Sequence, residues 1–107
     1  AAIADYAELT DKNIETLYGS IAAIDLGTIY YNRGDYKNAE TTIDKLIDSA
    51  SPHQYWMARG FILLSDVYAK QGDNFKAREY LESLRSNYPG KEAEIFDMID
   101  KRLSVLK

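Results

Sequence analysis

The 107-residue sequence has no cysteine and one histidine, His53, and these shortages exclude several kinds of site. Without thiols the chain cannot form disulfides, thiolate nucleophiles or a zinc centre built from several Cys and His ligands. Acidic pairs such as Asp44 and Asp48 have the helical spacing of a solvated face. They also lack the central glycine and terminal glutamate of a calcium loop. We therefore predict no metal centre and no cofactor.

Long apolar runs are missing as well. The longest run, residues 61–64, is far shorter than the roughly 18 residues needed to cross a bilayer, so we expect no membrane span. Residues 1–5 contain no initiator methionine, no basic region and no long apolar core, so they do not resemble a secretory signal. We expect the N-terminus to be trimmed and the chain to be a fragment of a longer protein.

Positive charge is scarce: 13 Lys and Arg against 17 Asp and Glu give a net charge of −4. Nucleic-acid-binding domains usually carry a basic face, so we expect no nucleic-acid partner. Catalytic motifs are absent too, since Gly19-Ser20 lacks the flanks of a nucleophile elbow and Gly90-Lys91 lacks the upstream glycine of a phosphate loop. The sequence predicts a domain that is not an enzyme.

Apolar residues recur with the period of an α-helix through most of the chain, and no alternating β pattern competes with them. The pattern predicts helices over residues 14–32, from 36 onward, over about 52–71, from 75 to a point before 88, and within 91–107. The fold class is therefore all-α.

Two kinds of signal mark the helix boundaries. Gly34-Asp35 and Gly72-Asp73 each combine a residue that readily becomes left-handed with a good N-cap for the following helix. The string at 51–54 predicts another helix start, with Ser51 as N-cap, Pro52 at the first helical position and Gln54 closing a capping box.

A shift of 38 residues aligns the sequence with itself. The matched pairs are Leu26 with Leu64, Tyr30 with Tyr68, Gly34 with Gly72, Ala39 with Ala77, Ile43 with Leu81 and Leu46 with Leu84. This two-helix pattern resembles the tetratricopeptide repeat, with Ser65 replacing the usual glycine seen at Gly27. The family period is about 34 residues, so about one extra helical turn is expected, and we place it at residues 54–57.

The resemblance implies a right-handed α–α superhelix of two helical hairpins plus a C-terminal capping helix. We expect one domain: an N-terminal segment at 1–13, repeats at 14–51 and 52–90, and the cap at 91–107. A cap is needed because each hairpin must cover its apolar face with a neighbour. Ile3, Tyr6 and Leu9 indicate either a short partial helix or the remnant of an earlier repeat.

The resemblance also implies a non-catalytic module that binds another protein in the concave groove of the superhelix, in a scaffold or assembly role. The residues carried over to that groove are Ile24, Thr28, Tyr31, Tyr55, Arg59, Ile62 and Asp66. Ile24 and Ile62 could instead pack one repeat on the next, whereas Tyr and Arg are enriched at interface hot spots. Asp66 would repel a partner's C-terminal carboxylate, so that ligand class is not expected.

Two further hypotheses stay open. The domain could be a structural end segment of a longer solenoid, or a homo-oligomer that pairs through Phe96, Ile99, Leu103 and Leu106 of the C-terminal helix. Trp56 could be buried against the preceding helix or contact a ligand. The stretch 52–64 also resembles the C-terminal part of large bacterial tetratricopeptide proteins, which implies the periplasm or cell envelope.

Overall fold

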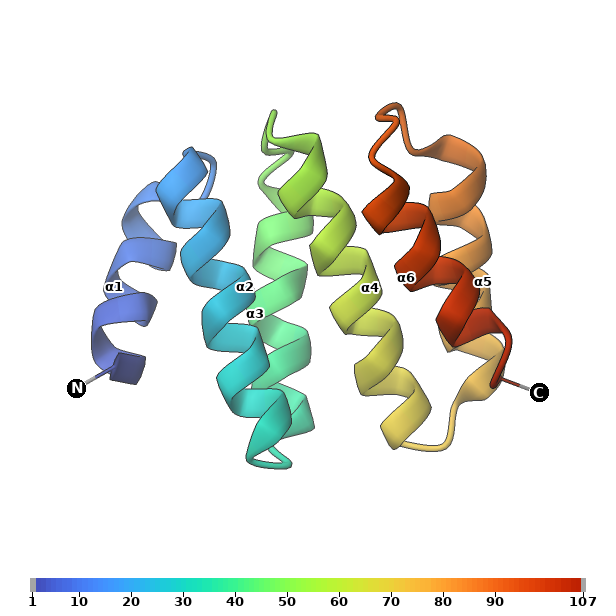
Figure 1. The fold of residues 1–107 in the computed structure, drawn as a ribbon. Helices are drawn as coiled ribbons and strands as arrows, with labels where there is room; N and C mark the ends of the chain where they lie inside the picture. Colours follow the sequence, from blue (N-terminus) through green and yellow to red (C-terminus); the bar gives the residue numbers. More distant parts are fainter. Residues whose placement is uncertain (1, 107) are drawn as a thin grey trace.

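The chain forms six helices that stand side by side, as a computed structural model shows (Figure 1). It describes residues 2–106, apart from the side chains of residues 2, 9 and 11–13. The helices are α1 (Ala2–Asn13), α2 (Leu17–Asn32), α3 (Tyr36–Asp48), α4 (Gln54–Lys70), α5 (Asn74–Asn87) and α6 (Ala93–Leu103). No strand occurs within 2–106, so the all-α prediction is confirmed.

The helices lie in two layers. In Figure 1, α2, α4 and α6 stand in front, while α3 and α5 lie behind them. Within the described chain, helices contact only their neighbours in sequence or, for α2 with α4 and α4 with α6, the next but one. The hairpins α2–α3 and α4–α5, with α6 packed on both helices of the second hairpin, form the expected superhelix with its capping helix.

The N-terminal segment is the helix α1, which packs against α2. It therefore stands beside α2 much as α3 stands beside α4. Ile3 and Tyr6 are half-buried there, whereas the side chain of Leu9 lies outside the described residues.

Both Gly-Asp turns have the predicted geometry. Gly34 and Gly72 have φ of 77° and 87°, the left-handed conformation that glycine adopts without strain. Asp35 Oδ1 accepts a hydrogen bond from Asn38 N at 3.3 Å, and Asp73 Oδ1 accepts one from Lys76 N at 3.1 Å. These short turns reverse the chain, so each hairpin pairs its two helices.

Two clusters of buried side chains form the core, and residues matched by the internal repeat appear in both. The first cluster consists of Ala23, Ile24, Ile43, Leu46, Leu63 and Leu64. The second consists of Ala58, Ile62, Leu81, Leu84, Ile95 and Ile99. The repeat therefore encodes packing: Ile43 and Leu81, 38 residues apart, fill equivalent places in successive hairpins.

The third helix begins two residues later than the predicted start at about residue 52. Helix α4 begins at Gln54, and its N-cap is His53, which makes no side-chain capping bond. Ser51 is instead 3 % exposed, and its Oγ lies 2.9 Å from Oγ of Ser20 on α2. Either hydroxyl can be the donor between them, because Ser20 Oγ also lies 2.9 Å from the carbonyl of Ile14 and Ser51 Oγ lies 3.5 Å from that of Glu15. Ser51 Oγ also accepts from the backbone N–H of His53 at 3.3 Å, so this hydroxyl joins a local turn to α2 and does not cap α4.

Replacing Ser51 with alanine is expected to destabilise the fold by about 1 to 2 kcal/mol, because a buried hydrogen bond is lost. Urea denaturation of Ser51→Ala, Ser20→Ala and the double variant measures the coupling between the two hydroxyls. The double variant should lose clearly less than the sum of the single losses. Additive losses would show that the two side chains act independently.

Candidate functional site

The surface of the layer formed by α2, α4 and α6, called the front face below, carries five of the seven residues expected to contact a partner. Thr28 is exposed, and Tyr31, Tyr55, Arg59 and Asp66 are partly exposed. The other two, Ile24 and Ile62, are only 5 % and 2 % exposed and belong to the two core clusters. Their role in this structure is packing.

One group of side chains links α4 to α6 around Arg59. Arg59 Nη1 donates to Tyr55 Oη at 2.9 Å, and Tyr55 Oη donates to Glu94 Oε1 at 2.9 Å. The Arg59 guanidinium lies 5.8 Å from the ring centroids of both Tyr55 and Trp56. A looser ion pair, 3.9 Å from Arg59 Nη1 to Glu94 Oε2, completes the group. Arg59 is therefore held in place while 33 % of its side chain stays exposed.

Trp56 itself is partly buried and packs against the first core cluster. Its ring meets that of Tyr55 edge-on, with the ring centroids 5.0 Å apart. Of the two hypotheses that the sequence left open for this residue, the structure favours burial.

A second group links α4 to α6 through Asp66 and Arg102. Arg102 Nε and Nη2 donate to the two carboxylate oxygens of Asp66 at 2.8 and 3.0 Å, a bidentate pair. The two side chains are 25 % and 30 % exposed, so water screens them only in part. Asp66 is therefore neutralised by its partner, which the sequence pattern did not reveal.

Tyr31 of α2 lies next to this pair. Burial raises the pKa of the Tyr31 phenol, the negative charge of Asp66 raises it further, and Arg102 opposes the shift. The Tyr31 ring also meets Tyr36 edge-on, with the centroids 5.8 Å apart. A row of polar groups therefore crosses the front face from α2 through α4 to α6.

The Asp66–Arg102 pair should stabilise the fold by about 1 kcal/mol. This is near the upper end of the stabilisation measured for exposed ion pairs, and we expect it because the pair is bidentate and partly buried. Denaturation of Asp66→Ala, Arg102→Ala and the double variant, at low and high salt, measures this coupling. The pair of Arg85 with Asp100, 46 % and 52 % exposed, provides a comparison that should couple more weakly. Equal coupling in the two pairs would contradict the role given to burial.

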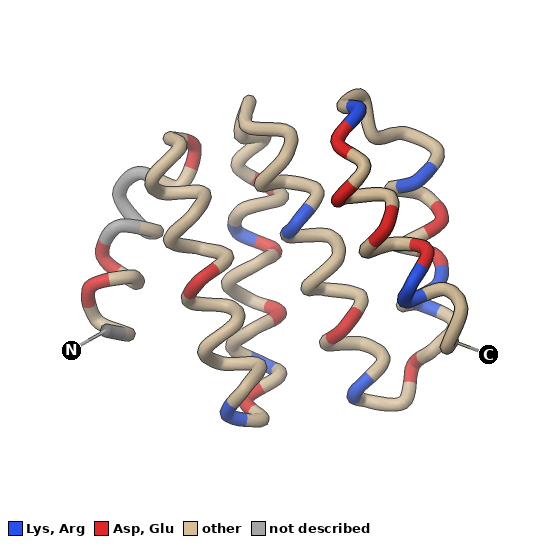
Figure 2. Tube along the Cα trace, viewed as in Figure 1, with Lys and Arg blue, Asp and Glu red and all other residues tan. Residues whose placement is uncertain are grey.

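Charge is unevenly distributed over the front face. Figure 2 shows that α2 carries almost no charged residues, whereas α6 carries both signs. The charged residue of α2 is Asp25, since the rest of its sequence is apolar, aromatic or neutral polar. A partner would therefore meet mainly uncharged surface on α2 and mixed charges on α6.

The apolar stripe of the C-terminal helix faces inward. Ile99 is fully buried, and Leu103 and Leu106 pack against the second core cluster. The Phe96 ring meets Tyr88 edge-on, with the centroids 5.8 Å apart. The stripe therefore covers the second hairpin, while Phe96, Leu103 and Leu106 stay partly exposed.

Within residues 2–106, no group of three or more His, Asp or Glu side chains is arranged to hold a metal ion. None of the helices between residues 2 and 106 is long and apolar enough to span a membrane.

Sequence comparisons agree with the hairpins seen in the structure. Two family models, both described as tetratricopeptide repeat, match residues 22–53 and 60–91 and together cover more than half of the chain. The first match spans most of α2–α3 and the second most of α4–α5. No curated protein and no solved structure gives a significant match. Tetratricopeptide repeats generally mediate protein–protein interactions and form non-catalytic modules. From the two matched repeats and the helical hairpins that they form, the chain belongs to the tetratricopeptide repeat family.

Proposed function

We propose that this domain binds a segment of a partner protein on its front face, in a scaffold or assembly role, through Thr28, Tyr31, Tyr55, Arg59 and Asp66. The observation that carries the proposal is the presence of two polar groups that each link α4 to α6, one around Arg59 and one around Asp66. Each is partly exposed and already held in a defined arrangement. The buried Ile24 and Ile62 support this surface from below.

Preorganisation is the physical reason to expect useful affinity. Arg59 is already fixed by Tyr55, Trp56 and Glu94, so it loses little side-chain freedom on binding. Tyrosine and arginine are also the residue types that most often dominate binding energy. On α2, the Thr28 hydroxyl donates to the Ile24 carbonyl at 2.8 Å, which leaves its oxygen free to accept from a partner.

The proposal is tested by affinity capture from native lysate with the wild-type domain and a Tyr31→Ala, Arg59→Glu double variant. A matched control, Phe75→Ala with Lys91→Glu, makes the same kinds of change at exposed positions on α5 and in the loop before α6. Circular dichroism first confirms that all three proteins are folded. A partner retained by wild type and control but lost by the front-face variant supports the proposal, and equal capture by all three contradicts it.

A second candidate function, a structural segment of a longer solenoid or of a self-associated assembly, is favoured by one observation. Helix α1 stands beside α2 as α3 stands beside α4, so α1 corresponds to the second helix of a repeat and α6 to the first helix of another. Such end helices could stack on further repeats. Light scattering tests self-association, because a mass that does not change with concentration would rule it out.

A further inference from the structure

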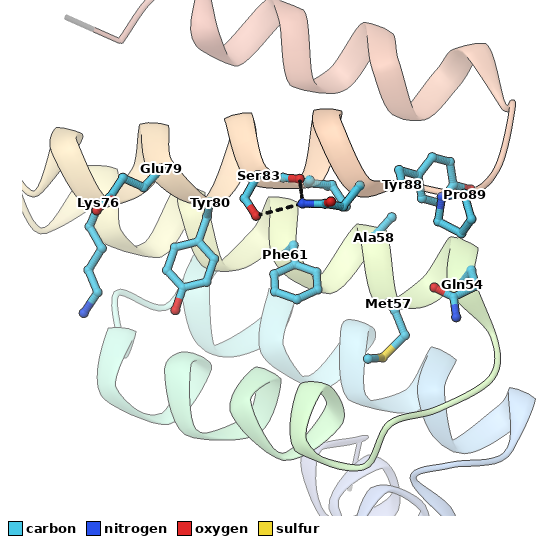
Figure 3. Close-up of a pocket in the computed structure, with 12 residues that line it drawn as sticks. Gln54, Met57, Ala58, Phe61, Lys76, Glu79, Tyr80, Ser83, Tyr88 and Pro89 are labelled. Atoms are coloured by element: carbon cyan, nitrogen blue, oxygen red, sulfur yellow. Dashed lines mark hydrogen bonds between the residues drawn. The ribbon is translucent and has the colours of Figure 1, made fainter.

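A groove of about 500 Å³ lies between α4 and α5, away from the front face (Figure 3). Its floor is largely apolar and aromatic, with Met57, Ala58 and Phe61 from α4 and Tyr80, Leu84 and Tyr88 from α5. Its polar lining includes Lys76, Glu79, Ser83 and Asn87. Met57 and Phe61 lie on the opposite side of α4 from Arg59 and Asp66, as the helical period requires, and Figure 3 shows both pointing away from α6.

Helix α3 runs alongside this groove and carries an acidic stripe, defined by Glu40, Asp44 and Asp48 at intervals of four residues. Two observations place the stripe near Tyr68 of α4, beside the groove. Burial and the nearby Glu40 carboxylate both raise the pKa of the Tyr68 phenol, and the Tyr68 ring stacks on Tyr80 of α5 with the centroids 5.5 Å apart. Lys76 Nζ in turn lies 4.5 Å from the centroid of the same Tyr68 ring.

Electrostatics agree with this placement. Burial raises the pKa of Asp44, and the neighbouring carboxylates Glu40 and Asp48 raise it further, while Lys76 across the groove lowers it. The stripe is thus a row of like charges that a bound cation would relieve. Of the residues that line the groove, Lys76 and Glu79 are charged and balance each other. The acidic stripe beside the groove adds three carboxylates from α3, and Lys37, about one turn before the stripe, adds one ammonium group. Together these groups carry a net negative charge.

We propose that this groove binds a basic amphipathic helix of a partner protein. The helix would insert a large apolar side chain between Met57, Phe61 and Tyr80 and set Lys or Arg side chains against the acidic stripe. The α5 residues that line the groove extend from Lys76 to Asn87. These 12 helical residues span about 18 Å, so a ligand of about three helical turns matches the length of the groove. Helix-in-groove recognition of this kind uses apolar anchors at intervals of three and four residues. The site is separate from the front face and does not depend on it.

The test uses two synthetic 14-residue helical peptides with the same leucine face, one flanked by lysines and the other by glutamates. Each is titrated into the ¹⁵N-labelled full chain, and amide chemical shifts are followed by NMR. We expect the lysine peptide to bind and to shift signals of α3 and α5. The glutamate peptide should bind at least tenfold more weakly, since several surface charge pairs each change sign.

Two variants locate the binding. Asp44→Lys with Asp48→Lys should weaken the lysine peptide about tenfold. The matched control Glu15→Lys with Asp97→Lys makes the same change in net charge elsewhere and should leave binding nearly unchanged. Ser83→Trp, at an exposed position, should block the groove without changing any charge.

Several results would overturn the proposal. These are failure of the lysine peptide to bind at millimolar concentration, equal weakening by the groove and control variants, and undiminished binding to Ser83→Trp. Shifts confined to α2, α4 and α6 would also overturn it, although they would support the front face as a binding surface. Failure of the front-face capture experiment leaves this test unaffected, so the two proposals stand or fall separately.

Discussion

Replacement of Ile99 with alanine is expected to lower the free energy of unfolding by about 3 kcal/mol, because a fully buried side chain leaves a cavity that its neighbours only partly fill. Ile99 is the centre of the contact between α6 and the second hairpin, where it shares a cluster with Ile62, Leu81 and Leu84. The loss should appear as a lower urea midpoint in circular dichroism at 222 nm. It should affect the whole transition, since α6 is part of the same core.

Asp97→Ala is the matched control, because Asp97 is an exposed residue of the same helix. Its effect should stay within about 0.5 kcal/mol. If Ile99→Ala costs no more than this control, α6 is an appended helix that the second hairpin does not need. If only a late, small part of the transition shifts, α6 unfolds separately from the rest. Either result would contradict its role as the capping helix.

Gly27→Val is expected to destabilise the domain by about 2 kcal/mol, because the site has no room for a side chain. A Cβ atom at Gly27 would lie 2.9 Å from Ile43 Cδ1 and 3.0 Å from Leu63 Cδ2, closer than van der Waals contact allows. Helix α2 can approach α3 and α4 only because this position lacks a side chain. The gain in helix propensity of valine over glycine, a few tenths of a kcal/mol, offsets little of this cost.

Two further variants test this explanation. Gly60→Ala should be nearly neutral, because its Cβ would lie 3.3 Å from the flexible end of Leu46, and alanine favours the helix by about 1 kcal/mol. Adding Ile43→Val to Gly27→Val removes the nearest clashing atom and should restore part of the stability. If the losses of the two single variants simply add in the double variant, or if the double variant is less stable still, a local clash is not the cause.

The parts of the fold that the sequence predicted are those set by neighbouring residues. The two Gly-Asp turns follow from a left-handed glycine and an aspartate cap within two positions, so both were correct. The internal repeat predicted the equivalence of Ile43 and Leu81, since both must fill the space between two hairpin helices. Even the departure at Ser65 is accommodated, because its buried hydroxyl donates to the Ile62 carbonyl of its own helix at 2.6 Å.

What the sequence could not predict depends on distant contacts. Ser51 is not the N-cap of α4, and its hydroxyl instead contacts that of Ser20, 31 positions earlier. Glu94 and Arg102, which complete the two polar groups of the front face, were missed for the same reason. The sequence did contain one signal for these pairs. Along α4 a positive residue, Arg59, is followed seven positions later by a negative one, Asp66. Along α6 a negative residue, Glu94, is followed eight positions later by a positive one, Arg102, so each charge can meet its opposite. For Ile24 and Ile62, helical period alone could not separate a groove floor from a core position.

The contact pattern of the helices has a consequence for how the chain folds. Each described helix touches only those one or two places away in sequence, so few contacts join distant parts of the chain. Proteins with such local topology cross a low entropic barrier and fold in microseconds to milliseconds, much faster than sheet proteins of similar size. A nascent chain could therefore form its first hairpin before the second is complete, with each new helix adding to a surface already in place.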